Sequence, residues 1–217
     1  MLRSVKLVGF FIIVLLVHIP SLGMASSEAA IREAAYGVDV EAMAEWRSHW
    51  EQASASAEKY STLAAVFNFY ADYYEFVTDD SGLRREYTDK TIEAAERALD
   101  LGAETASVYA LLADGYARRI TGAITGIRFG SRLSNAVEQA EALDPDNEDL
   151  LYLQGKQYLL APTLAGGDRD KAVERFEWLT QEYPGSYFYR VLLAKALLNR
   201  DPERAAALLE EAEALRR

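Results

Sequence analysis

Arginines form the group of side chains best suited to binding chemistry. Between Asp114 and Glu138 the sequence has no acidic residue, although the net charge of the whole chain is −11. This interval instead contains four arginines: Arg118, Arg119, Arg128 and Arg132. A guanidinium group offers a planar fork of donors that matches carboxylates and phosphates. The interval therefore predicts a site for an anion or an acidic partner. The alternative is that the arginines pair with acids of neighbouring helices or cap a helix.

Tyrosines are the second group of candidate binding residues. The segment YSTLAAVFNFYADYYEFV carries aromatic side chains on two sides of one predicted helix, and these include Tyr70 and Tyr74. A helix that is apolar over so much of its circumference is typical of the middle of a domain. In the alternative interpretation part of it lines a groove, where tyrosine combines a flat apolar contact with a polar tip. Three more tyrosines would extend that surface: Tyr109, Tyr116 and Tyr152.

The composition gives little support to catalysis. The chain has no cysteine, and His49 is the only histidine after the first 25 residues, so nucleophilic and metal-dependent mechanisms lack their usual side chains. The glycines at 122, 126 and 130 are not followed by the Gly-Lys-Ser/Thr of a phosphate-binding P-loop. The acidic run Asp144–Asp149 lacks the glycine and the distal glutamate of an EF-hand, and is better explained as a turn and helix cap. We expect no enzyme activity, no cofactor and no metal ion.

The first 25 residues have the pattern of a secretory signal. Arg3 and Lys6 give a positive start, and the run Leu7–Val17 is almost wholly apolar. The small residues of Gly23–Ala25 suit a signal peptidase, so we expect cleavage after Ala25 and an exported protein, periplasmic or secreted. The alternative is an uncleaved segment that anchors the protein in the inner membrane, although the apolar run is only about half of a membrane span.

The rest of the chain is predicted to be all-α and repetitive. Ala, Leu, Glu and Arg dominate, and the alternating runs typical of strands are absent. The small residues Ala71, Ala113 and Gly155 follow one another at intervals of 42, and Ala194 lies 39 residues further on. Around the first three, large residues and a tyrosine recur at fixed offsets: Phe67-x-x-Tyr70-Ala71-x-x-Tyr74, Tyr109-x-x-Leu112-Ala113-x-x-Tyr116 and Leu151-x-x-Gln154-Gly155-x-x-Tyr158.

This pattern resembles the tetratricopeptide repeat (TPR), in which a small residue and a tyrosine on one helix precede an alanine, a large residue and a proline around the next. The third unit matches best, through Gly155, Tyr158, Ala172, Phe176 and Pro184. The resemblance implies a right-handed α-solenoid of about four helix pairs over residues 59–217. Residues 26–58 are predicted to be an N-terminal capping region, with one helix over Asp39–Gln52. Its Trp46 and Trp50 cover the first edge of the stack or, in the alternative, bind a ligand.

The intervals of 42 residues exceed the about 34 residues of a simple TPR unit. The surplus falls between the two helices of each unit, as in the stretch PTLAGG that begins at Pro162. Because all such connections emerge at one edge of a stack, we expect three lengthened loops that form a common rim. The glycine-rich middle loop is either flexible or a short helix with a small-residue packing face.

We therefore expect a non-enzymatic scaffold or adaptor of the bacterial cell envelope that holds a peptide or protein partner in a concave groove and rim. The alternative is a periplasmic module that binds a small carboxylate, similar to the TPR components associated with TRAP-type transporters. A closed, tyrosine-lined cavity with inward arginines would favour the second function, and an open groove would favour the first. The acidic surface argues against nucleic acid and anionic lipid as partners. The last helix is either covered by a second copy in a homo-oligomer or left in water.

Cleavage of the signal is directly measurable. We expect protein recovered from the cell envelope to begin at Ser26, by N-terminal sequencing and intact mass. Replacing Ala25 by tryptophan should block cleavage, because the peptidase requires a small residue there. An unaltered N-terminus at Met1 in protein that fractionates with the membrane would instead establish the anchor.

Overall fold

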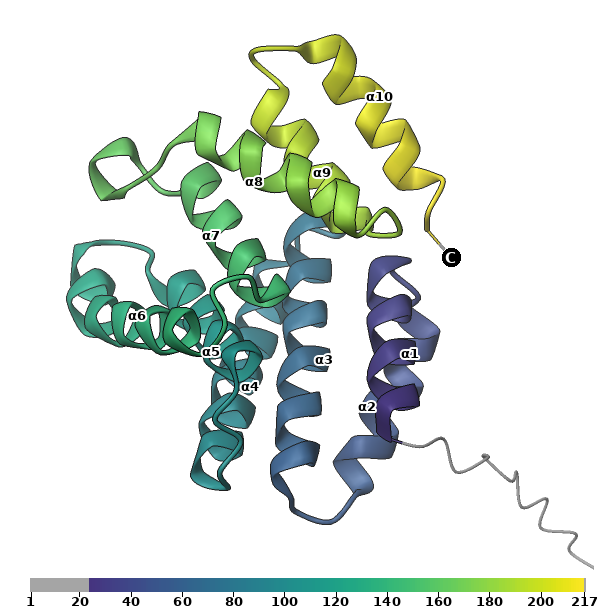
Figure 1. The fold of residues 1–217 in the computed structure, drawn as a ribbon, viewed down its shortest axis with the longest axis vertical. Coiled ribbons are helices and arrows are strands. Elements are labelled where there is room, and N and C mark those ends of the chain that lie inside the picture. Colours follow the sequence, from purple (N-terminus) through teal and green to yellow (C-terminus); the bar gives the residue numbers. More distant parts are fainter. Residues whose placement is uncertain (1–23, 217) are drawn as a thin grey trace, which may run out of the picture.

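In the computed structural model, residues 24–216 form ten α-helices and one short 3₁₀ helix, and this part of the chain contains no β-strand (Figure 1). The prediction of an all-α protein is confirmed. Residues 1–23, which carry most of the proposed signal, lie outside the described residues. No helix over residues 24–216 is long and apolar enough to cross a bilayer. The helices are α1 (Met24–Tyr36), α2 (Val40–Gln52), α3 (Ala57–Phe76), α4 (Ser81–Asp100), α5 (Ala106–Arg119), α6 (Ala123–Leu143), α7 (Glu148–Leu160), η1 (Thr163–Ala165), α8 (Arg169–Glu182), α9 (Tyr187–Leu197) and α10 (Pro202–Glu213).

Side-chain caps define where the helices begin, because a capping oxygen satisfies backbone N–H groups that have no partner within the helix. Asn147 caps α7 by accepting from the backbone N–H of Leu150, at 3.3 Å. Asp201 caps α10, and Pro202 occupies the first helical position, where its missing N–H costs nothing. The acidic run before α7 is therefore a turn and cap, as the sequence predicts.

Each of the helices α3, α5, α7 and α9, called here the leading helices, packs against the helix that follows it in the chain. Consecutive leading helices also contact one another, which makes a row from α3 through α5 and α7 to α9. In Figure 1, α1 and α2 lie on one side of α3, and α9 and α10 lie at the top of the view, where the row ends. The arrangement brings residues separated by one repeat interval onto neighbouring helices.

The small residues of the repeat lie where neighbouring helices approach. Ala71 and Ala113 are fully buried. At Gly155, an added Cβ would lie 2.9 Å from Cζ of Phe176 on α8 and 3.2 Å from Cγ of Arg175. The ring of Phe176, itself fully buried, therefore occupies the space that a side chain at Gly155 would need.

The prediction of three lengthened loops is wrong for two of them. Residues 77–80 join α3 to α4, and residues 120–122 join α5 to α6, so both connections are short. The surplus residues instead lengthen α4 and α6, which have 20 and 21 residues. The segment expected to be an arginine-rich loop is therefore mostly the first half of α6. Its helical glycines make no close packing face, because a Cβ at Gly126 would meet only Ile120, at 3.9 Å, and one at Gly130 would meet nothing within 4 Å.

The third connection is a real loop, and its backbone explains the glycines. The chain leaves α7 at Ala161, forms η1 and reaches a left-handed residue at Gly166, with φ 91°. The next glycine packs against the end of α7, because a Cβ at Gly167 would lie 1.9 Å from the carbonyl oxygen of Ala161. The N–H of Asp168 then donates to the carbonyl of Tyr158 at 2.8 Å, which ties the start of α8 to α7.

The N-terminal region contains two helices where the sequence predicted one. The predicted helix is α2, capped by Asp39, and α1 precedes it. Trp50 is buried and Trp46 is partly buried against the same core, which fits the covering role. At the other end of the chain, Leu209 of α10 is 43 % exposed. A second copy against this helix stays a prediction.

The close approach at Gly155 is testable by a matched pair of substitutions. Gly155→Ala should lower the free energy of unfolding by about 1–3 kcal/mol, because Phe176 must move. Gly130→Ala, in open space on α6, should instead raise it by up to about 1 kcal/mol through helix propensity. Urea denaturation followed by circular dichroism measures both values. Equal effects of the two substitutions would contradict the packing described here.

Candidate functional site

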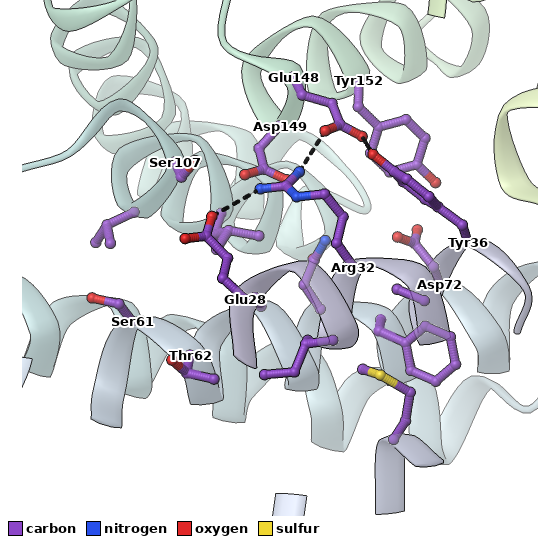
Figure 2. A pocket seen from close by; sticks show the side chains of 18 of the residues that line it. Glu28, Arg32, Tyr36, Ser61, Thr62, Asp72, Ser107, Glu148, Asp149 and Tyr152 are labelled. Carbon is purple, nitrogen blue, oxygen red and sulfur yellow. Dashed lines mark hydrogen bonds and ion pairs between the residues drawn. The ribbon is translucent and has the colours of Figure 1, made fainter. Parts of the chain in front are cut away.

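A cavity of about 610 Å³ lies between α1 and the four leading helices (Figure 2). Its walls combine apolar side chains with three tyrosines: Ile31, Met43, Phe69, Val108, Leu111 and Phe188, with Tyr36, Tyr152 and Tyr189. This volume is in the range of sites that hold a small molecule or a few residues of a peptide, about 300–1,000 Å³. The cavity is the main candidate site in the described part of the chain.

A buried carboxylate joins α1 to the leading helices at one end of this cavity. Glu148, the first residue of α7, is 8 % exposed and forms an ion pair with Arg32 of α1. The hydroxyl of Tyr36 donates to Glu148 at 2.6 Å, and that of Tyr189 on α9 donates to the same oxygen. Burial raises the pKa of Glu148, and the charge of Arg32 and the two tyrosine hydrogen bonds oppose that rise. One carboxylate therefore connects three helices.

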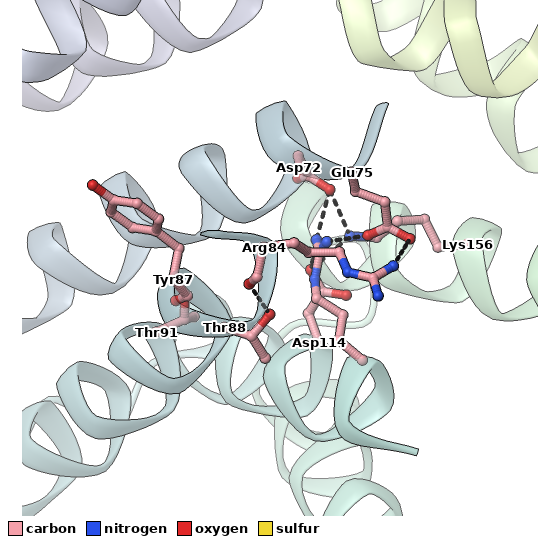
Figure 3. A network of polar contacts seen from close by, with 9 residues as sticks. Asp72, Glu75, Arg84, Tyr87, Thr88, Thr91, Asp114 and Lys156 are labelled. Carbon is pink, nitrogen blue, oxygen red and sulfur yellow. Dashed lines mark hydrogen bonds and ion pairs between the residues drawn. The ribbon is translucent and has the colours of Figure 1, made fainter. Parts of the chain in front are cut away.

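A second polar cluster crosses the leading helices next to the cavity (Figure 3). Asp72 of α3, Asp114 of α5 and Lys156 of α7 are each nearly fully buried. The ammonium of Lys156 lies 2.6 Å from Asp114 and 3.3 Å from Asp72. The guanidinium of Arg118 lies 2.6 Å from Asp72 and 2.9 Å from Asp114, and it also pairs with Glu75. Asp72 lines the cavity, so the network forms part of its wall.

Three members of this network are spaced by the 42-residue repeat interval. Asp72, Asp114 and Lys156 directly follow Ala71, Ala113 and Gly155, the small residues that mark the repeat. Equivalent positions on successive leading helices therefore form one row of charged residues, with two aspartates followed by a lysine. The sequence analysis missed this row, although a charged residue after each small residue was a readable signal.

The electrostatics of the network favour its ionised form. Burial of the Asp114 carboxyl disfavours its charge, but Arg118 and Lys156 outweigh this effect and lower its pKa to about 2. Burial likewise opposes the charge of Arg118, but Asp114, Asp72 and Glu75 hold its pKa well above the ordinary value. A charge in this environment persists only with its partners, because desolvation without compensation is costly.

The structure separates Arg118 from the other three predicted arginines, which lie around the stacked rings of Tyr116 and Phe129. Arg118 turns toward α3 and enters the buried network. Arg119 pairs with Asp89 of α4 at 3.3 Å, and its guanidinium also lies 5.7 Å from the ring centre of Phe129. The guanidinium of Arg128 is 5.2 Å from the same centre, and that of Arg132 is 5.9 Å from the ring centre of Tyr116. None of the four lines the cavity.

Of the five predicted tyrosines, only Tyr152 lines the cavity. Tyr70 and Tyr74 instead stack on Tyr87 of α4, at 4.8 and 5.5 Å between ring centres. The hydroxyl of Tyr116 donates to Glu96 of α4 at 2.7 Å. Tyr109 is partly buried against a small cluster of α5, α6 and α7 residues. These four tyrosines pack between a leading helix and its neighbours, which is the buried alternative that the sequence analysis left open.

Two buried polar atoms beside the cavity have no hydrogen-bond partner. They are Oδ1 of Asn68 and the hydroxyl of Tyr152, and both residues line the cavity. An unsatisfied buried polar atom costs about 1–3 kcal/mol. Asn68 and Tyr152 each precede a marker residue, Ala71 or Gly155, by three positions, so they too are equivalent in the repeat.

Comparisons with known proteins were negative: no family model matches the chain, and no curated protein matches its sequence. Within residues 24–216, no group of three or more histidine or acidic side chains is arranged to hold a metal ion.

The buried network makes a prediction about acid stability. An unfolded aspartate has a pKa of about 3.9. Because the folded value for Asp114 is lower, its charge stabilises the fold above about pH 4, and this contribution is lost as the pH falls toward 2. Asp114→Asn should lower the free energy of unfolding at pH 7 by about 3 kcal/mol, since it leaves buried cations undercompensated.

The same variant should lose less stability than the parent between pH 4 and pH 2. Urea denaturation at each pH measures this difference. Asp79→Asn is the control, because Asp79 is exposed in the α3–α4 connection and asparagine tolerates its positive φ of 54°. Parallel stability curves for Asp114→Asn and the parent would contradict the assignment.

Proposed function

We propose that the protein is a non-enzymatic interaction module of the bacterial cell envelope, built as a TPR-like right-handed solenoid, that holds a peptide segment of a partner in the cavity beneath α1. The solenoid is supported by the four helix–helix packings of leading and following helices and by the row of leading helices. Export is supported by the signal-like N-terminal sequence.

The proposal depends on which helices supply the residues of the cavity wall. Apart from α1 and Met43 of α2, its residues come from the leading helices and the residues that cap them, and several occupy positions that are equivalent in the repeat. Phe69 and Leu111, for example, each lie two residues before a marker alanine. Repeat proteins present extended concave surfaces in this way, with one set of side chains contributed by each unit. Such a surface fits a partner segment that runs across several helices.

The chemistry of the lining supports binding rather than catalysis. Its ionisable side chains are carboxylates, tyrosines and one arginine, and Arg32 and Glu148 already hold one another. The lining contains neither cysteine nor histidine, which are among the side chains most often used as nucleophile and general base.

A small ligand is the second candidate occupant, and two observations favour it. The volume suits one, and α1 covers part of the groove. The organic-acid form of this proposal is less well supported, because the cavity is lined by one arginine and five carboxylates. The predicted arginines lie elsewhere.

Filling the cavity tests whether it is the binding site. Ser61 of α3 lines the cavity (Figure 2), so Ser61→Trp places an indole against the space that a ligand would occupy. Ser134→Trp, on the exposed side of α6, is the matched control. A phage-displayed random peptide library is selected on the parent protein. We expect enriched peptides to bind the parent and Ser134→Trp alike, and to bind Ser61→Trp at least about tenfold more weakly.

Thermal melting first establishes that both tryptophan variants are folded. Enriched peptides that bind Ser61→Trp as tightly as the parent would place the binding surface elsewhere. Failure of the parent to enrich any peptide would count against a peptide-binding function.

A further inference from the structure

We propose that the cavity beneath α1 selects a cation: an ammonium or guanidinium group carried on an apolar body, presented as a basic side chain of the bound peptide segment. This inference rests on the proposed function and specifies the chemistry of its ligand. It is the opposite of the anion preference that the arginine-rich sequence suggested.

The charges of the lining are the first argument. Five carboxylates face one arginine: Glu28, Glu58, Asp72, Glu148 and Asp149, with Arg32. Asp72 is compensated by Lys156 and Arg118, and Glu148 by Arg32. Glu58 forms no ion pair in the described part of the chain, and Asp149 shares the single charge of Arg32 with Glu28 and Glu148. These two carboxylates stand at the first turns of α3 and α7. A cation entering the cavity would gain their attraction, whereas an anion would be repelled.

Arg32 shows how this end of the cavity already holds a guanidinium group. Its side chain lies 3.3 Å from Glu28 and pairs with Glu148, and Figure 2 shows Asp149 beside it. Burial opposes the charge of Arg32, but Asp149 and Glu148 outweigh it and keep the pKa above the ordinary value. The local field is therefore negative enough to retain a partly buried cation.

The buried acceptor of Asn68 is an independent argument. Asn68 is 8 % exposed, and its Oδ1 atom has no hydrogen-bond partner. A carbonyl oxygen can only accept, so the group that satisfies it must donate. Lysine and arginine side chains carry only donors, whereas a carboxylate has none to offer. A cationic side chain can therefore supply the missing donor, which a carboxylate cannot, and the hydroxyl of Tyr152, also without a partner, is a second acceptor in the cavity wall.

The apolar part of the ligand follows from the remaining wall. Phe69, Phe188 and Tyr189 line the cavity together with aliphatic side chains. Aromatic faces attract ammonium and guanidinium groups, and they also cover the methylene stem of a basic side chain. Within the protein, the ammonium of Lys156 already lies 4.2 Å from the ring centre of Tyr152. A basic residue next to apolar residues matches all of these groups.

Three synthetic peptides test the inference on the purified full chain. They are acetyl-Phe-X-Phe-amide, in which X is arginine, citrulline or glutamate. Citrulline has nearly the shape of arginine without its charge, so it isolates the electrostatic contribution. Isothermal titration calorimetry should show the arginine peptide binding at least about tenfold more tightly than the citrulline peptide, with a preference that shrinks as salt rises.

Substitutions of the two carboxylates Glu58 and Asp149 locate the effect. Glu58→Gln and Asp149→Asn should each reduce the preference for arginine over citrulline, and the double variant should nearly abolish it. Glu138→Gln is the matched control, because Glu138 is exposed on α6, away from the cavity. Thermal melting of each variant verifies that the fold is kept.

The outcomes separate this inference from the proposed function. Equal binding of the arginine and citrulline peptides, or tighter binding of the glutamate peptide, would overturn the cation preference while leaving the cavity as a peptide site. Agmatine binding as tightly as the arginine peptide would support the cation preference but assign the site to small amines. Absence of binding by all three peptides and agmatine overturns the cation inference, and the library selection on Ser61→Trp then decides the proposed function separately.

Discussion

The buried charges shared by α3, α5 and α7 constrain how these helices pack. Asp72, Asp114 and Lys156 are at most 4 % exposed, so each needs its partners on the neighbouring helices. A shift of one helix by a single residue would rotate its charge away and leave the others uncompensated. Such a state costs several kcal/mol, whereas apolar contacts tolerate small shifts more readily. The network therefore fixes the register of the row, and the cavity wall is built on that register.

Polar contacts also hold α1 over this row. Arg32 and Tyr36 of α1 meet Glu148 of α7, and Tyr189 of α9 reaches the same carboxylate. α1 contributes Ile31 and Ala34 to the core as well, so its attachment combines apolar burial with one ionic junction. The consequence is that α1 partly covers the side of the row that lines the cavity. A ligand must share this space with α1 or displace it.

The charge of the side chains that line the cavity differs from what the arginine-rich sequence suggested. The arginine-rich interval of the sequence suggests an anion site, but none of its four arginines lines the cavity. Arg118 forms ion pairs within the buried network, while Arg128 and Arg132 lie over aromatic rings of α6 and α5. What remains around the cavity is a surplus of carboxylates and a buried acceptor on Asn68. The arrangement of side chains, rather than the composition of a segment, thus decides which ligand the site suits.

Local patterns in the sequence determined the all-α fold, the helix starts at Asn147 and Asp201, and the 42-residue interval, because helix periodicity and capping depend on near neighbours. They did not determine where the surplus residues go. A glycine-rich stretch is compatible with a loop, but in the structure it begins α6, with Thr125 capping the helix start and Phe129 stacked on Tyr116 of α5. The cavity also depends on tertiary structure, since it joins Arg32 to Glu148 and Asp72 to Lys156 across long chain separations. No local pattern in the sequence predicts these ion pairs, because they form only when helices that are distant in the chain pack together.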